Sequence, residues 1–193
     1  MVSKIKRYPY MTDLEGNLYV EIEYKTSAAY DEKNKPIVSM VIMLPNKKES
    51  TDFNLNYTKE IADLVSMPQD QKNKLESVEL HMPKFEIKNK INLNEILIKL
   101  GLEKIFNPPY RGFENISDSK NIAVSDVIHQ SFIKVDEEGT EAAAATAIIM
   151  LRMAIMPNRN HKKIHIDRPF GFWIVEKNSK TVLFTGKVVD PSE

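Results

Sequence analysis

The chain has 193 residues, of which 42% are hydrophobic and 28% are charged, and these values exclude an intrinsically disordered protein. Its 27 Lys and Arg residues balance 27 Asp and Glu residues, so no net field draws the chain to nucleic acid or to an anionic membrane surface. The sequence contains no cysteine, which excludes disulfides, thiolate chemistry and cysteine-ligated metals.

The first third of the chain predicts two strands. Residues 18–24 alternate apolar and polar side chains after a turn at Gly16 and Asn17, which is the pattern of a half-buried strand. Residues 37–44 form a continuous apolar run that ends at Pro45, as expected for a buried strand. We expect these two strands to pair.

Helices and strands are both predicted in the middle of the chain. Ile61, Leu64 and Val65 have helical spacing, and residues 69–75 are predicted to form a second short helix after Pro68. Two strand-like pieces, at 78–82 and 85–87, meet at Pro83. A further helix is predicted from the N-cap Asn92 to the stop at Gly101, with apolar positions at Leu93, Ile96, Leu97 and Leu100.

The chain closes with a predicted hairpin. Residues 168–176 are apolar and strand-like, 178–180 supply a turn, and 181–191 form the second strand. Strands, a few helices and then strands again predict an α+β fold and not alternating βαβ units.

A second distinctive segment is residues 137–147, EEGTEAAAATA. Four consecutive alanines favour helix, whereas the flanking threonines and the following isoleucines also allow an extended strand. A segment that is exposed in one state and enters a crowded sheet in another requires small side chains and a glycine hinge. The alternative is an ordinary alanine-rich surface helix.

The hinge-like segment and the terminal hairpin, in this order and spacing, resemble the C-terminal part of the serpins, suicide inhibitors of serine and cysteine proteases. Four further stretches resemble the same family: LHMPKF at 80–85, LIKLGLEKIF at 97–106, GFENI at 112–116 and VIHQSFIKV at 127–135. The resemblance covers the whole chain but only about half of a serpin. It implies one partial domain over 1–193, with mixed sheets, few helices, no N-terminal helical half and an exposed reactive loop at about 137–166.

The resemblance also implies a set of site residues. After protease cleavage, the loop would insert as an extra strand into the large sheet while the protease remains acyl-linked. At the family's usual spacing, fourteen residues beyond Gly139, the residue before the scissile bond is Met153, followed by Ala154. Arg152 is the alternative, because it suits a trypsin-like pocket whereas Met153 suits a chymotrypsin- or elastase-like one. The hinge residues are Glu137, Glu138, Gly139, Thr140, Glu141, Ala142, Ala143, Ala144, Ala145 and Thr146.

The missing half of the domain supports a second hypothesis. Insertion requires a strand on each side of a gap, and this chain supplies only the side that includes residues 121–135. The alternative is therefore a truncated, non-inhibitory binding module that proteases merely cleave and that self-associates through an exposed sheet edge. The expected partner is otherwise a serine protease of the trypsin, chymotrypsin or elastase type.

The family analogy implies a secreted protein, and the sequons at Asn56 and Asn115 fit that location. Because no apolar signal core follows Met1, an intracellular location is the alternative.

Enzymatic chemistry and bound cofactors are not expected. No nucleophile elbow or glycine-rich phosphate loop occurs, and the histidines His81 and His129 have no cysteine partners. His161 and His165 have the spacing of a helical metal pair, but Lys162, Lys163 and the alternation toward Pro169 favour an extended segment. We therefore predict no metal, no cofactor and no catalytic residue.

Overall fold

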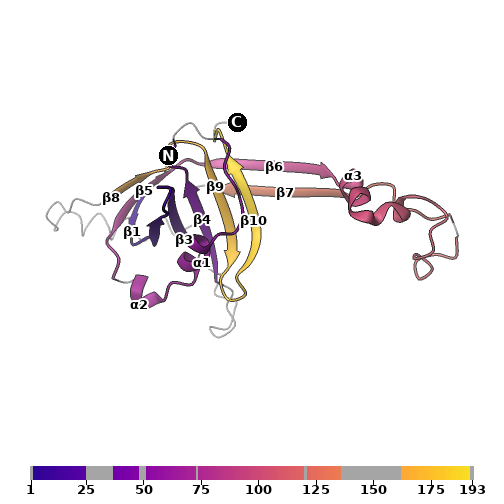
Figure 1. The fold of residues 1–193 in the computed structure, drawn as a ribbon, viewed down its shortest axis with the longest axis horizontal. Helices are drawn as coiled ribbons and strands as arrows, with labels where there is room; N and C mark the ends of the chain where they lie inside the picture. The colour runs from indigo at the N-terminus through magenta and orange to yellow at the C-terminus, as the bar shows by residue number, and fades with distance from the viewer. Residues whose placement is uncertain are drawn as a thin grey trace. The chain divides into compact units, whose positions relative to one another are not determined.

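The computed structural model describes residues 2–24, 37–47, 51–72, 74–119, 121–135 and 162–191, with the backbone alone for residues 2–5 and 69. Two compact units are present: Met1–Phe85 together with Val135–Glu193, and Glu86–Lys134. The elements, coloured along the chain in Figure 1, are β1 Val2–Lys6, β2 Tyr10–Thr12, β3 Leu18–Glu23, β4 Val38–Leu44, α1 Lys59–Val65, α2 Gln69–Lys72, β5 Val78–Met82, β6 Phe85–Asn92, α3 Asn94–Leu97, η1 Ile98–Leu102, η2 Glu103–Phe106, β7 Ile128–Val135, β8 Lys162–His165, β9 Phe170–Glu176 and β10 Thr181–Val188.

The first unit is built on a five-stranded antiparallel sheet in the order β10-β9-β4-β3-β2. The predicted pairing of the two N-terminal strands is confirmed, since Val20 lies opposite Ile42 in the β3–β4 register. The predicted terminal hairpin is also confirmed as β9 and β10, with a bulge between Val182 and Phe184. The hairpin places β9 beside β4, which is far from it in sequence, and β10 at the edge of the sheet.

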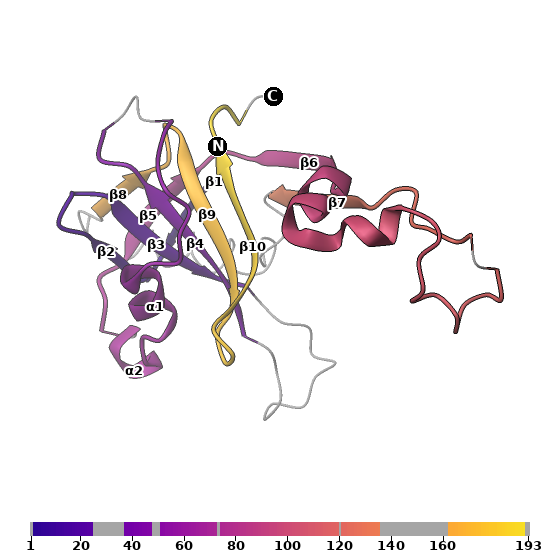
Figure 2. The same ribbon diagram turned by 45° about the vertical axis from the view of Figure 1, so that its right-hand side comes forward.

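One apolar cluster of the core lies on the face of this sheet where α1 packs (Figure 2). Ile61, Leu64 and Val65 are buried on α1, which confirms the helix predicted from their spacing. They pack into a cluster with Tyr19, Val41, Met43, Trp173 and Val175. Burial of these apolar side chains, at about 25 cal/mol per Å², is the main driving force for this unit.

The opposite face of the sheet meets a second sheet. Strands β1, β5 and β8 form a three-stranded sheet with β5 in the centre. Phe85, just after β5, contacts the ring of Phe170 edge-on and lies tilted against Phe172. Leu80 and Ile164 are buried partners in the parallel β5–β8 register, so this sheet also turns one apolar face inward.

Strand β3 differs from its prediction. The alternation predicted a half-buried strand, yet Tyr19, Val20 and Glu21 are all buried. Both faces of the strand are covered because α1 packs on the side that carries Tyr19, and the Glu21 carboxylate there is neutralised by partners.

Glu21 is the centre of a buried charge network and is 0% exposed. Its carboxylate accepts hydrogen bonds at 2.7 Å from the Ser39 hydroxyl and from the Lys177 ammonium, and forms an ion pair at 2.8 Å with Lys72. Glu23, partly exposed, contacts the same two ammonium groups at 3.3 and 3.5 Å. Burial lowers the pKa of Lys72, but its hydrogen bond and charge interactions with Glu21 more than offset this and raise that pKa.

In the second unit, residues 86–134, the described residues form no apolar core. Strands β6 and β7 pair in opposite directions, and α3, η1 and η2 follow β6 (Figure 1). None of its described residues is buried. Large apolar side chains are exposed throughout it: Ile91, Ile96, Ile98, Leu100, Leu102, Ile116, Ile128 and Phe132.

The helix predicted over 92–101 forms only in part. The N-cap is Leu93 and not the predicted Asn92, although the Asn92 side chain accepts a hydrogen bond from the Asn94 N–H at 2.9 Å. The α-helix then spans only Asn94–Leu97, and a π-helical turn continues to a break at Gly101, whose φ is 93°. The apolar positions have helical spacing, but no residue of α3 or η1 is buried, so packing does not extend the α-helix.

We expect Glu21→Ala to destabilise the first unit by about 3 to 5 kcal/mol, because two nearly buried ammonium groups lose their shared partner. Urea unfolding followed by the fluorescence of Trp173, the only tryptophan, measures the change. Glu23→Ala, at a partly exposed carboxylate, is the control and is expected to cost about 0 to 1 kcal/mol. Equal costs for the two variants would contradict the central role of Glu21.

Candidate functional site

The predicted reactive-loop residues lie outside the described residues. This applies to the hinge, Glu137 to Thr146, and to the scissile-bond candidates Arg152, Met153 and Ala154. The structure describes the two strands that flank this segment, β7 before it and β8 after it. These strands belong to different units, apart from Val135 at the end of β7, and each is therefore described by itself.

The strand after the segment, β8, is short and lies at the edge of the three-stranded sheet. It pairs in parallel with β5 through four residues, from Lys162 opposite Val78 to His165 opposite His81. Two parallel His rings face each other across this pair, with centroids 4.3 Å apart and an interplanar angle of 10°. The backbone continues the pairing, as the N–H of Ile166 donates to the carbonyl of His81 at 2.9 Å.

Charged side chains surround the His pair. The Nε2 atom of His81 lies 2.8 Å from the Glu79 carboxylate, whose other oxygen is 3.6 Å from the Lys163 ammonium. Because side chains alternate along a strand, Lys162 points to the other face, where its ammonium lies 4.2 Å from the Tyr10 ring centroid. The β8 strand is thus fixed by aromatic, ionic and backbone contacts together.

The strand before the segment, β7, is more open. Its residues are exposed or partly exposed, and Phe132 is 54% exposed. The Lys88 ammonium on β6 lies 5.5 Å from the centroid of the Phe132 ring. This exposed cation–π contact contributes about 0.5 to 1 kcal/mol, so it does not replace a core.

The start of β7 is held by an amide network. The Asn94 carboxamide accepts from the N–H of Val127 and donates to the carbonyl of Ser125, both at 2.9 Å. The Asn92 amide donates to the Asp126 carboxylate at the same distance. Hydrogen bonds, and not apolar packing, therefore connect the α3 end of this unit to β7.

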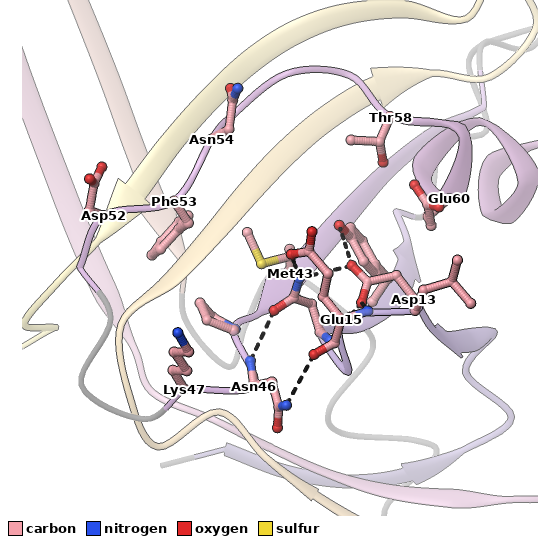
Figure 3. A pocket seen from close by; sticks show the side chains of 14 residues that line it. Asp13, Glu15, Met43, Asn46, Lys47, Asp52, Phe53, Asn54, Thr58 and Glu60 are labelled. Atoms are coloured by element: carbon pink, nitrogen blue, oxygen red, sulfur yellow. Dashed lines mark hydrogen bonds between the residues drawn. The ribbon is translucent and has the colours of Figure 1, made fainter.

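The first unit also contains a cleft of about 820 Å³ between the β2–β3 turn, the end of β4 and the segment that leads into α1 (Figure 3). In Figure 3, Asp52 and Phe53 lie on one side of this cleft and Thr58 and Glu60 on another, with Asp13 and Glu15 between them.

The turn in this cleft is preorganised by Asp13. Its carboxylate accepts hydrogen bonds from the N–H groups of Glu15 and Asn17 and from the Asn17 amide, at 2.8 to 3.0 Å. Asn46, just after β4, connects the turn to that strand. Its backbone N–H donates to the side-chain oxygen of Asn17, and its side-chain amide donates to the backbone carbonyl of Glu15. Burial, then the charge of Asp13, raises the pKa of the Tyr19 phenol to about 12.

No metal centre is found in the part of the chain that the structure describes, where no three His, Asp or Glu side chains could share an ion. His161 lies outside the described residues, so the predicted absence of a His161–His165 metal pair stays a prediction. The extended form predicted for Lys162 and Lys163 is confirmed by β8. No helix within the described ranges is long and apolar enough to cross a membrane.

Comparison with protein families identifies the family to which this chain belongs. A family model described as serpin (serine protease inhibitor) matches residues 1–191, nearly the whole chain. The chain belongs to the serpin family. The family resemblance inferred from the hinge-like segment and the terminal hairpin is thereby confirmed.

Relatives and solved structures agree. The chain is 34% identical to an uncharacterized serpin-like protein of Thermococcus kodakarensis, over 81% of this chain and 35% of that protein. It is 32% identical to the human leukocyte elastase inhibitor, over 95% of this chain and 46% of the relative. A serpin from the trematode Schistosoma haematobium matches 98% of this chain and 45% of its own, with a TM-score of 0.61 and 22% identity.

Two conclusions follow from these matches. The α+β, serpin-like fold predicted from the order of elements is confirmed. The chain spans less than half the length of the relatives and solved chains named above.

Sequence reasoning missed three features of this structure: the buried carboxylate Glu21, the cleft next to Asp13 and the stacked His81–His165 pair. The histidines were visible, but stacking depends on the β5–β8 register, which no local pattern gives. The alternation in 18–24 predicted that Glu21 faces solvent. Its burial depends on Lys72 and Lys177, which are 51 and 156 positions away in sequence and therefore outside any local pattern.

We expect Gly16→Ala to destabilise the first unit by about 1 to 2 kcal/mol from backbone strain alone, since φ at this residue is 86°. An added Cβ would also lie 2.7 Å from Asn46 Nδ2 and displace the amide that holds the turn. In an Asn46→Ala background this second cost disappears, so the same substitution should cost less there. Urea unfolding of the wild type, the two single variants and the double variant measures the coupling energy. Strictly additive losses of stability would contradict a direct interaction between Gly16 and the Asn46 amide.

Proposed function

We propose that this chain is the protease-recognition part of a serpin and inhibits a serine protease as a suicide substrate, without enzymatic turnover of its own. One observation carries the proposal: the serpin family match runs through the hinge-like segment at 137–147 and on into β8, β9 and β10. In this proposal residues 1–193 form part of a single domain, and residues 137–166 are its reactive loop.

The proposed mechanism begins as ordinary proteolysis. The serine hydroxyl of the protease attacks the carbonyl carbon of the residue before the scissile bond, and the leaving amine takes up a proton. The loop is then held to the protease by an ester and is free of its C-terminal continuation. Insertion of residues 140–149 as a strand would remove the acyl-enzyme from its working geometry before water hydrolyses the ester.

The side chains of the hinge support insertion. Ala142, Ala143, Ala144 and Ala145 have no bulk to clash with neighbouring strands, and Thr140 avoids burying a charge at the first inserted position. Met153 is proposed as the residue before the cleaved bond. Arg152 is the competing position, and the protease type distinguishes the two.

The first experiment mixes the purified chain with trypsin, chymotrypsin and elastase in separate reactions. We expect a covalent complex on a denaturing gel with chymotrypsin or elastase, and mass spectrometry should place the new C-terminus at Met153. A new C-terminus at Arg152 with trypsin would reassign the cleavage site. Cleavage in this segment by every protease without any complex would refute the inhibitory mechanism.

Thr140→Arg supplies the control for this assay. We expect this variant to be cleaved at the same bond but to lose most of the complex, because insertion would bury an unpaired guanidinium group. Thr146→Arg is a matched change six positions later, on the same face of the proposed inserted strand, and we expect it to lose complex in the same way. Undiminished complex formation by Thr140→Arg would contradict strand insertion.

A second candidate function is a non-inhibitory, self-associating module. The observation that favours it is the second unit, residues 86–134, where no described residue is buried and Ile128 and Phe132 are each 54% exposed. Apolar surface of this kind favours association, either with another segment of polypeptide or with a second copy.

A native sizing column combined with light scattering tests the second candidate. Self-association through the second unit predicts a dimer or larger species that dissociates at least about tenfold more readily in Phe132→Ser. Leu183→Ser, at a 48% exposed position on β10, is the matched control. A monomer with a single melting transition would argue against this candidate.

The location follows the family analogy in this proposal. We propose an extracellular protein, with an intracellular one as the alternative. Asn56 and Asn115 are both exposed, so both sequons are accessible to glycosylation. Sensitivity of the protein from its native source to an amidase that removes N-linked glycans distinguishes the two locations.

A further inference from the structure

One face of the three-stranded sheet has an unusual charge pattern. On β5 it carries Glu79 and His81, and on β8 it carries Lys163 and His165, which lie opposite them in register. The β1 residues opposite Glu79 and His81 are Ile5 and Ser3, which cannot titrate. Across the described β5–β8 pair, this face therefore holds the carboxylate of Glu79, the ammonium of Lys163 and two imidazoles.

The two imidazoles have different neighbours. The His81 ring has a carboxylate partner at 2.8 Å, so a proton on His81 completes an ion pair with Glu79. The His165 ring is stacked on His81 at 4.3 Å, and Lys163 lies two positions before it on the same strand. A second proton, on His165, would place three cations around a single carboxylate.

The repulsion would act on a short edge strand. Strand β8 has four residues and, among the described residues, pairs with β5 on one side only. Neutral rings that stack stabilise this pairing, whereas two imidazolium rings in the same geometry repel each other. The apolar partners Leu80 and Ile164 on the other face are unaffected by pH.

We propose that His81 and His165 are positioning residues that fix the register of β8 on β5 when they are neutral, and that release it when both are protonated. Because β8 directly follows residues 136–161, the pair sets where the C-terminal end of the predicted reactive loop is anchored. This last consequence rests on the proposed function; the positioning of β8 does not.

Hydrogen exchange measured by mass spectrometry tests the proposal on the intact chain. After correction for intrinsic rates, we expect the β8 amides to open about tenfold more at pH 5 than at pH 8, the range in which imidazoles change charge. Amides of β9, in the same unit, serve as the internal reference and should stay protected at both pH values. High salt should restore β8 protection at pH 5, because the repelling groups are partly exposed.

Two substitutions separate charge from packing. His165→Phe keeps an aromatic ring against His81 but cannot be protonated, so β8 should be protected at both pH values. His129→Phe, on β7, is the matched control and should behave as the wild type. Equal β8 protection at the two pH values in the wild type, or pH dependence that survives in His165→Phe, would overturn the proposal.

The covalent-complex assay separates this inference from the proposed function. At pH 6, His165→Phe should form a larger fraction of complex with the target protease than the wild type does. If β8 exchange shows the expected pH dependence while no variant forms a complex at any pH, the inhibitory function fails and the positioning of β8 by the His pair stands.

Discussion

The buried Glu21 carboxylate is the constraint around which the first unit is organised. An isolated charge in that position would cost several kcal/mol, so the fold has to bring cations to it. Lys72 comes from α2 and Lys177 from the turn after β9, and both reach the same carboxylate. Helix α2, strand β3 and the C-terminal hairpin are therefore connected through one carboxylate, and apolar side chains alone would not specify that geometry so narrowly.

The local parts of this arrangement could be predicted from sequence. Short apolar runs bounded by Pro and Gly identified β4, β9 and β10, and the spacing of Ile61, Leu64 and Val65 identified α1. These signals are local because each depends only on which face of one element is apolar. Burial of both faces of β3 could not be predicted, because one face is covered by α1, which lies elsewhere in the sequence.

The same reasoning explains why the helix predicted between residues 92 and 101 is α-helical only in part. The apolar positions there have helical spacing, which normally indicates a buried face, but a spacing pattern does not say what buries that face. In the described structure nothing buries it, and the α-helix stops after Leu97. A short helix without tertiary packing is marginal in water. The segment changes to a π-helical turn after Leu97, and the break at Gly101 lies where the sequence predicted the helix to stop.

The contrast between the two units bears on the proposed function. The segment with the hinge and the scissile-bond candidates leaves a strand without a core, β7, and enters a strand backed by buried side chains, β8. Local stability follows buried apolar contacts, so the two ends of this segment differ in how readily their flanking strands open. An inhibitor that must insert its loop needs the N-terminal side to rearrange and the C-terminal side to stay fixed until cleavage. The buried side chains of this chain are distributed in the same way. Ile164 and Ile166 are buried after the segment, and no described residue of 121–134 is buried before it.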